Sequence, residues 1–255
     1  MSETKMLADG TNPEGVDPSP PLNWKDAKDL KDVVLYGTKF SPPCAKIQSH
    51  LKYCKVNFET VNGKNEESEY KKIPALKVQG RQVNDSFIIM KHLIPILYEG
   101  ETFDFEWEKK ITYGVQIAME IESFNDGEST LDIATKMGGF NCCLARFLTA
   151  CCCCLLPIGP NSCSPMARRI EAKRSSPANV KKYGPLRDFE DYLKEFRAAL
   201  KGGPFFDGRK RPSAVDVSMY GTIYRWEILP FVQKALQSSD LNAWLGRMKD
   251  AHGLS

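Results

Sequence analysis

The segment Ser41-Pro42-Pro43-Cys44 contains the residues best suited to chemistry. It follows a short apolar run, Val33 to Tyr36, and leads into a stretch whose apolar residues recur at helical spacing. Because proline is tolerated in the first turn of a helix, we expect the helix to begin at this segment. The N–H groups at a helix start stabilise an anionic sulfur, and Lys39 adds a positive charge nearby. The segment therefore predicts a thiolate site.

Asp85 and Ser86 mark the predicted start of a second helix, which continues through Phe87 to Ile94. The amides at such a start, together with the Ser86 hydroxyl, suit a carboxylate ligand. The structural alternative is that Asp85 or Ser86 only caps the helix.

Four consecutive cysteines, Cys151 to Cys154, lie in the apolar stretch 147–158, whose 12 residues are too few for a membrane span of about 20. A basic segment follows at 168–187, with the cations Arg168, Arg169, Lys173, Arg174, Lys181, Lys182 and Arg187. This combination favours docking at a membrane surface, with S-palmitoylation of the four cysteines and contact between the cations and anionic lipid.

Two other interpretations of the cysteine cluster stay open. One is a buried hairpin between helices, followed by a solvated basic loop. The other is a soft-metal site, although adjacent cysteines lack the CxxC spacing of zinc sites. Such a site would use Cys142, Cys143, Cys151, Cys152, Cys153, Cys154 and Cys163.

The apolar pattern predicts the elements that position these residues. Over residues 31–100 the order is β, α, β, a short helix or loop, β, β, α, with strands at 33–36, 57–61, 75–78 and 82–84. Gly80 provides the turn of the hairpin between the last two strands. The helix that starts at Ser86 is expected to kink or end at Pro95.

The chain divides into three parts by composition. Residues 1–30 are polar and rich in Pro, Gly and Asp, so we expect a flexible leader without chemistry. After residues 31–100 the strand signals stop, and residues 101–255 predict a helical domain with a Cys-rich and basic insertion at about 141–185. Within that domain, Ser213 to Asp216 predict a capping box that begins a core helix.

Composition excludes several classes. The 255 residues carry 35 Lys plus Arg against 32 Asp plus Glu, a net charge of +3 that is too small to favour a nucleic-acid partner. Nine cysteines, four of them consecutive, are not a disulfide framework, so we expect reduced thiols. Residues 1–24 lack the apolar core of a signal peptide, and we expect a cytoplasmic protein, with peripheral contact to an intracellular membrane as an addition. The three histidines are scattered, so no metal site is expected from them.

Together these pieces resemble the glutathione transferase superfamily, in which a thioredoxin-like domain precedes an all-helical one. Within it, the residues most resemble the family of membrane-associated prostaglandin E synthase type 2. The resemblance rests on four segments in the family's order, 35–44, 72–74, 84–86 and 212–221. It implies an α/β thioredoxin-like N-terminal domain and an all-α C-terminal domain, the glutathione transferase fold.

The resemblance also implies a glutathione site along one edge of the first domain. Ile73-Pro74 resembles the cis-proline position, where the residue before proline pairs with the cysteinyl backbone of glutathione. Asp85 and Ser86 match the acidic residue and the serine that hold the γ-glutamyl end. The sulfur would then lie at Ser41, with Lys39 beside it. Haem at the same site and a homodimer are further implications of the resemblance.

The chain departs from the family at two positions. The family has Cys-Pro-x-Cys where this chain has Ser41-Pro42-Pro43-Cys44, and its tyrosine three residues earlier is Thr38 here. Because serine cannot form a mixed disulfide, we do not expect dithiol reductase chemistry. Ser41 either donates a hydrogen bond to the glutathione thiolate or only caps the helix. Cys44 is either a core residue or the remaining reactive thiol.

Two functions follow from these interpretations. The first is a glutathione-dependent transferase or isomerase that activates the glutathione thiol against a small apolar electrophile or endoperoxide. The second is a membrane-peripheral binding or scaffold protein that has kept the transferase fold without the nucleophile. The missing first cysteine, Thr38 and the cysteine-basic insertion motivate the second hypothesis.

Overall fold

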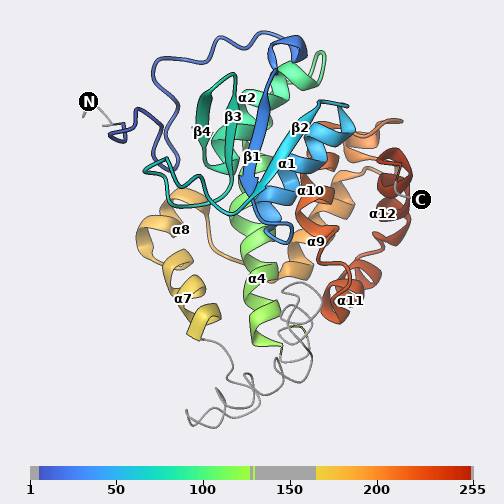
Figure 1. The fold of residues 1–255 in the computed structure, drawn as a ribbon. Helices are drawn as coiled ribbons and strands as arrows, with labels where there is room; N and C mark the ends of the chain where they lie inside the picture. The colour runs from blue at the N-terminus through green and yellow to red at the C-terminus, as the bar shows by residue number, and fades with distance from the viewer. Residues whose placement is uncertain (1–5, 127–128, 130–164, 254–255) are drawn as a thin grey trace, which may run out of the picture. The chain divides into compact units, whose positions relative to one another are not determined.

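The computed structural model describes residues 6–126, 129 and 165–253. Four strands form one mixed sheet in the order β2-β1-β3-β4, drawn side by side in Figure 1. The strands are β1 (Val33–Gly37), β2 (Phe58–Asn62), β3 (Ala75–Val78) and β4 (Arg81–Asn84). β1 pairs parallel with β2 and antiparallel with β3, and β3 pairs antiparallel with β4. Each predicted strand is confirmed to within one residue at either end.

The register of the sheet places three strand ends level with one another. Tyr36 of β1 pairs with Ala75 of β3, and Ala75 pairs with Asn84 of β4. β1 and β4 therefore end, and β3 begins, at the same end of the sheet. Since neighbouring strands lie about 4.8 Å apart, these three residues span roughly 10 Å. The segments that leave or enter the strands here carry the residues of the predicted site.

Helices α1 (Pro42–Tyr53) and α2 (Ser86–Leu97) pack against each other and against the sheet (Figure 1). α1 begins with two prolines in its first turn, as predicted, because the first N–H groups of a helix have no partner within it. Of the two outcomes expected at Pro95, a kink or an end of the helix, the end is wrong, since α2 continues to Leu97. So close to the helix end, the missing N–H of proline removes only one hydrogen bond.

The chain divides into two compact units whose bounds differ from the expected boundary at residue 100. Unit 1 consists of Met1–Thr112, Ala199–Arg225 and Ala243–Ser255, and unit 2 of Tyr113–Ala198 and Trp226–Asn242. The difference arises because α10 (Ala214–Ile223) packs on α1. At Gly221 the two helices approach so closely that a Cβ would lie 2.7 Å from the Cα of Lys46. α10, which comes late in the chain, thus packs in unit 1 with α1 and the sheet-forming segment.

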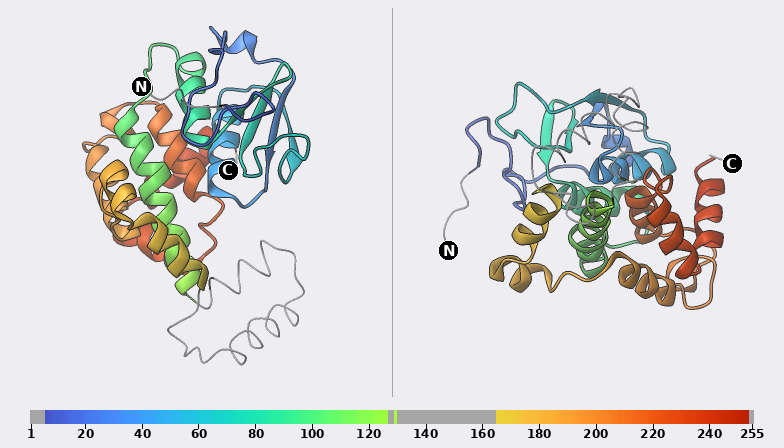
Figure 2. Two further views of the ribbon diagram at one scale, coloured as in Figure 1. Left: turned by 90° about the vertical axis from the view of Figure 1, so that its left-hand side faces the viewer. Right: turned by 90° about the horizontal axis from the view of Figure 1, so that it is seen from below.

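The other elements are helical, as predicted for the second half of the chain. Unit 1 also includes η1 (Ala27–Asp29), α3 (Phe105–Lys110), η4 (Phe206–Gly208) and most of α12 (Asn242–Ala251). After the π-helical turn η2 (Ile111–Val115), unit 2 contains α4 (Gln116–Asn125), α7 (Pro165–Arg174), α8 (Pro177–Tyr183), α9 (Phe189–Ala199) and α11 (Pro230–Ser238). α4 packs against α7, as Figure 2 shows. Within the described ranges, no helix is long and apolar enough to cross a lipid bilayer.

Buried polar side chains link α1 to α3 and α10 inside unit 1. Lys46 of α1 is 0% exposed, forms an ion pair with Glu108 of α3 and donates to Thr112 Oγ1 at 2.7 Å. The other oxygen of Glu108 accepts from Ser218 Oγ of α10 at 2.7 Å. A buried charge is tolerated only with a counter-charge and hydrogen bonds, so this network fixes α1 against both helices.

His50 of α1 extends the same network. Its Nε2 lies 2.8 Å from Ser218 Oγ, and its Nδ1 lies 2.7 Å from the Tyr98 hydroxyl. Because the Ser218 proton is given to Glu108, Ser218 accepts from Nε2–H, and Nδ1 accepts from Tyr98. Burial lowers the pKa of His50 well below its ordinary value, which keeps the imidazole neutral.

The predicted capping box at the start of α10 is confirmed. Ser213 Oγ accepts from the N–H of Asp216 at 3.3 Å, and Asp216 Oδ2 accepts from the N–H of Ser213 at 2.9 Å. Asp216 Oδ1 also accepts from the Trp244 indole and from the Phe206 N–H, each at 2.9 Å. The box therefore ties the start of α10 to α12 and to the loop before it.

We expect Glu108→Ala to lower the free energy of unfolding by about 3–5 kcal/mol, because it leaves the buried ammonium of Lys46 without its counter-charge. The double variant Lys46→Met/Glu108→Leu should recover most of that loss, since no buried charge remains. Urea denaturation measures both. In the exposed pair of Lys64 and Glu66, Lys64→Ala is the control and should change stability by less than about 1 kcal/mol. An effect of Glu108→Ala as small as that control would contradict this account.

Candidate functional site

The three motifs predicted to bind a ligand meet at one end of the sheet. The loop 38–41 follows β1, Ile73-Pro74 leads into β3, and Asp85-Ser86 follows β4. These strand ends are level in the register described above. Strand pairing therefore brings together segments that are far apart along the chain.

Ser41 is the N-cap residue of α1 and is half-buried. Its side chain makes no capping hydrogen bond, which argues against the capping interpretation of its hydroxyl. Pro42 and Pro43 have no N–H, and the N–H of Ala45 is already bonded to the carbonyl of Ser41. The expectation of several amides facing a sulfur is thus reduced to the Ser41 hydroxyl and the N–H of Cys44.

Cys44 lies in the first turn of α1 and is 0% exposed. Gly37 of β1 faces it so closely that a Cβ there would lie 2.5 Å from the sulfur. Burial raises the pKa of the Cys44 thiol and outweighs the opposing hydrogen bonds from the Ser41 side chain and the Thr38 backbone. Because the thiolate is the nucleophilic form, the structure favours the packing role over the reactive one.

Lys39 and Ile73 lie at the surface of the site. Lys39 is exposed, and its ammonium group is 5.5 Å from the centroid of the Phe40 ring. The peptide bond between Ile73 and Pro74 is cis, as the resemblance implied. Ile73 is half-buried and Pro74 is buried, so Ile73 is the member of the pair that a ligand can contact.

Asp85 is the N-cap of α2, and its capping role is confirmed by the N–H of Phe87, which donates to Oδ1 at 2.9 Å. The N–H of Gly15 donates to Oδ2 at 2.7 Å. Asp85 is 6% exposed, and burial raises the pKa of its carboxyl group against the effect of these two hydrogen bonds. Ser86, the first residue of α2, is also buried.

Residues 6–30, the described part of the leader, run beside β4 in Figure 1 (dark blue) and contact the site. Asn12 is 0% exposed, and its side-chain amide accepts from the N–H of Asn84 at 2.9 Å and donates to the Asn84 carbonyl at 3.0 Å. Glu14 forms an ion pair with Lys72. The expectation of a flexible leader without chemistry did not anticipate these contacts, because a polar segment shows no apolar periodicity.

Tyr70 is a further residue of the site that the sequence analysis missed. It is buried, and burial raises the pKa of its hydroxyl, with the nearby carboxylates of Asp85 and Glu14 raising it further. Tyr70 is therefore near the carboxylates of Asp85 and Glu14. It belongs to the stretch 62–72, which was predicted as a short helix or loop and is a loop here beyond the end of β2. A single tyrosine in a polar loop is not a recognisable motif.

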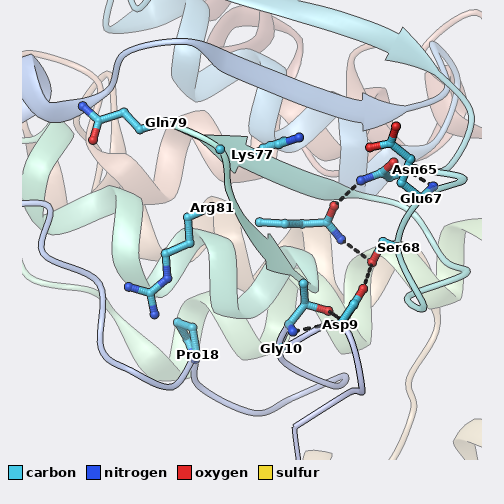
Figure 3. A pocket seen from close by; sticks show the side chains of 12 residues that line it. Asp9, Gly10, Pro18, Asn65, Glu67, Ser68, Lys77, Gln79 and Arg81 are labelled. Carbon is cyan, nitrogen blue, oxygen red and sulfur yellow. Dashed lines mark hydrogen bonds between the residues drawn. The ribbon is translucent and has the colours of Figure 1, made fainter.

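A polar cavity of about 600 Å³ lies between the leader and the β3–β4 hairpin (Figure 3). Its walls are joined by hydrogen bonds, from Asn65 to Gln82 at 2.7 Å, from Gln82 to Ser68 at 2.9 Å and from Ser68 to Asp9 at 2.6 Å. Burial acts to raise the pKa of Asp9, but hydrogen bonds from Ser68 and Thr11 outweigh it and lower the pKa to about 2. Asp9 is therefore ionised at neutral pH, and its hydrogen bonds hold the leader against the loop at Ser68 and Glu69.

Haem, the second ligand that the resemblance allowed, does not fit the three motifs. An axial ligand to iron is usually a histidine, cysteine, methionine or tyrosine side chain. The described segments 38–41, 73–74 and 85–86 contain none of these, and both Cys44 and Tyr70 are buried.

The cysteines of the lipidation and metal hypotheses lie outside the described residues, namely Cys142, Cys143, Cys151, Cys152, Cys153, Cys154 and Cys163. The basic segment after them is described. Arg174 is buried and donates to the carbonyls of Tyr113 and Gly184 at 2.7 and 2.9 Å, and Arg187 forms an ion pair with Glu195. Two of the seven cations thus have partners inside unit 2, which the charge pattern alone did not indicate.

Comparison with known proteins shows a similarity of fold. No model of a protein family matches the chain, and no curated protein matches it in sequence. The apo form of glutathione S-transferase III matches with a TM-score of 0.54 and 11% identity, over 87% of this chain and 94% of that one. The β-etherase LigF from Sphingobium sp. strain SYK-6 matches with a TM-score of 0.51 and 16% identity, over 88% and 99%. The chain therefore has the glutathione transferase fold, which confirms the predicted fold class.

We expect Cys44 to resist alkylation in the folded protein, because its thiol is buried and its pKa is raised. Iodoacetamide labelling followed by peptide mass spectrometry measures this, with the same reaction in denaturant as the control. Labelling of Cys44 in the native protein at the rate seen in denaturant would show that the thiol is accessible and would restore the reactive interpretation.

Proposed function

We propose that the protein binds glutathione at this end of the sheet and activates its thiol for attack on a small apolar electrophile. The observation that carries the proposal is the register that sets the Ser41 loop, Ile73-Pro74 and Asp85-Ser86 level with one another. The fold shared with glutathione S-transferase III is consistent with it. An endoperoxide is the finer substrate proposal, and it rests on the sequence resemblance to the prostaglandin E synthase type 2 family.

Each motif would supply a different part of the binding site. The carboxylate of Asp85 suits an ammonium group, and Ser86 with the amides at the start of α2 suits a carboxylate, so together they match the γ-glutamyl end. The backbone of Ile73, beside a cis bond that leads into β3, would pair with the central residue of the ligand. Lys39 adds a positive charge at the surface.

Ser41 would act on the sulfur. Its hydroxyl makes no capping bond and hydrogen-bonds to the Cys44 thiol instead. Turned from Cys44 to the ligand's sulfur, the hydroxyl would favour the thiolate and lower the pKa of the bound thiol. Because Pro42 and Pro43 offer no N–H, this hydroxyl carries more of the stabilisation than in a helix start without proline. The buried thiol of Cys44 takes no part.

Ser41→Ala should reduce turnover of an activated aryl chloride by about 10–100-fold and change the Kd for glutathione by less than about 3-fold, because the hydrogen bond matters chiefly to the thiolate. Calorimetry in reducing buffer measures Kd. The pH profile of kcat/KM should rise through the pKa of the bound thiol, and that inflection should move up by roughly 1–2 units in the variant.

Ser41→Thr is the matched control, because it keeps a hydroxyl and should keep most of the activity. Equal turnover by the wild type and Ser41→Ala would remove Ser41 from the chemistry. If the wild type binds no glutathione at millimolar concentration, the proposal is overturned.

Peripheral membrane binding is a second proposal, favoured by the basic segment of unit 2. The segment has five exposed cations on α7 and α8, namely Arg168, Arg169, Lys173, Lys181 and Lys182. Exposed cations at a membrane surface attract anionic lipid by about 1 kcal/mol each.

The double variant Lys181→Glu/Lys182→Glu should therefore bind vesicles that contain phosphatidylserine at least about 10-fold more weakly than the wild type. Co-sedimentation measures this, and Lys64→Glu, which reverses an exposed charge of unit 1, is the control. A wild-type protein that stays in the supernatant at low salt would rule out this proposal.

A further inference from the structure

The leader covers the carboxylate on which the proposed ligand depends. Asp85 has two oxygens, and one is used by the N–H of Phe87 and the other by the N–H of Gly15. The residue is 6% exposed with the leader in place. The N–H of Gly15 on Oδ2 and the low exposure of the residue together leave an ammonium group little access to this carboxylate while the leader is docked.

Asn12 is the main anchor of the leader at this position. β4 is an edge strand, and the side-chain amide of Asn12 pairs with the N–H and the carbonyl of Asn84 as a neighbouring strand would. The side chain of Asn84 also bonds to the leader, since its Nδ2 donates to the Asn12 carbonyl at 2.8 Å and to Thr11 Oγ1 at 3.0 Å. Asn12 and Asn84 are both 0% exposed, so these bonds are protected from water.

The remaining anchors near the site lie at the surface and are individually weak. Glu14 pairs with Lys72, and Asp17 pairs with Lys91, between side chains that are 42–55% exposed. Exposed ion pairs contribute about 0–1 kcal/mol each and weaken with salt. Leader residues 12–15 can therefore leave the site while Asp9 keeps its hydrogen bonds to Ser68 and Glu69, and beside Asp85 their hold depends mostly on Asn12.

We infer that leader residues 12–15 form an autoinhibitory segment, whose docking and the binding of glutathione at Asp85 exclude each other. The inference rests on the proposed function, because it names what regulates access to that site. The apparent affinity for glutathione is then the intrinsic affinity multiplied by the fraction of molecules in which the leader is released.

The test uses the full chain and the variant Asn12→Ala. The variant loses the amide that clamps Asn84, so the leader is released more often and glutathione should bind at least about 5-fold more tightly by calorimetry. Lys25→Ala, an exposed leader position away from Asp85, is the control and should leave the affinity unchanged. Circular dichroism checks that both variants stay folded.

A second measurement does not depend on a substitution. Saturating glutathione should speed hydrogen–deuterium exchange in the wild-type leader peptide that contains Gly15, because that N–H loses its acceptor. If the wild type binds glutathione but neither Asn12→Ala nor leader exchange responds, the inference is overturned and the proposed function stands. A folded Asn12→Ala that loses binding would make the leader part of the site and also overturn the inference. If no variant binds glutathione, the proposed function fails, and the inference fails with it.

Discussion

The ion pair between Lys46 and Glu108 is the interaction on which the rest of unit 1 depends. It is buried, and a buried charge without its partner costs several kcal/mol, so α1 has little freedom to shift against α3. Ser218 carries the same restraint to α10, and the close contact at Gly221 leaves no room between the helices. Since Ser41 directly precedes the first turn of α1, its position depends on where this network holds the helix.

The candidate site combines this rigid support with a cover, leader residues 12–15, that is held at the edge strand β4. Inside unit 1, a chain of hydrogen bonds runs from Tyr98 through His50 and Ser218 to Glu108, and all four residues are buried. At the edge of the sheet, Asn12 and Gly15 form hydrogen bonds to the buried residues Asn84 and Asp85, and the nearby ion pairs of the leader are exposed. Breaking the first arrangement would unfold the core, whereas breaking the second exposes Asp85 to solvent. The fold thus separates the buried network of α1, α3 and α10, which stays fixed, from the leader, which can move.

The proline pair at the start of α1 gives this site a distinct chemical character. Proline suits the first turn because its missing N–H has no partner there, but the same absence removes donors that would face a sulfur. Burial of Cys44 against Gly37 removes the protein thiol as well. What remains is a hydroxyl without a cap to make, which suits a protein that polarises a bound thiol and does not use its own.

Local pattern was enough to predict the strands, the starts of α1 and α2 and the Ser213 capping box, because each depends on residues close in sequence. Ile73-Pro74 was predicted from the family resemblance. Tertiary structure alone decided that α10 joins the core of unit 1, since a cap motif does not say which surface its helix will meet. It also decided that Tyr70, Asn12 and Gly15 belong to the site. Asn12 and Gly15 reach Asn84 and Asp85 by hydrogen bonds across 72 and 70 positions of chain, and Tyr70 is buried beside Asp85. Such contacts leave no periodic signal in the sequence.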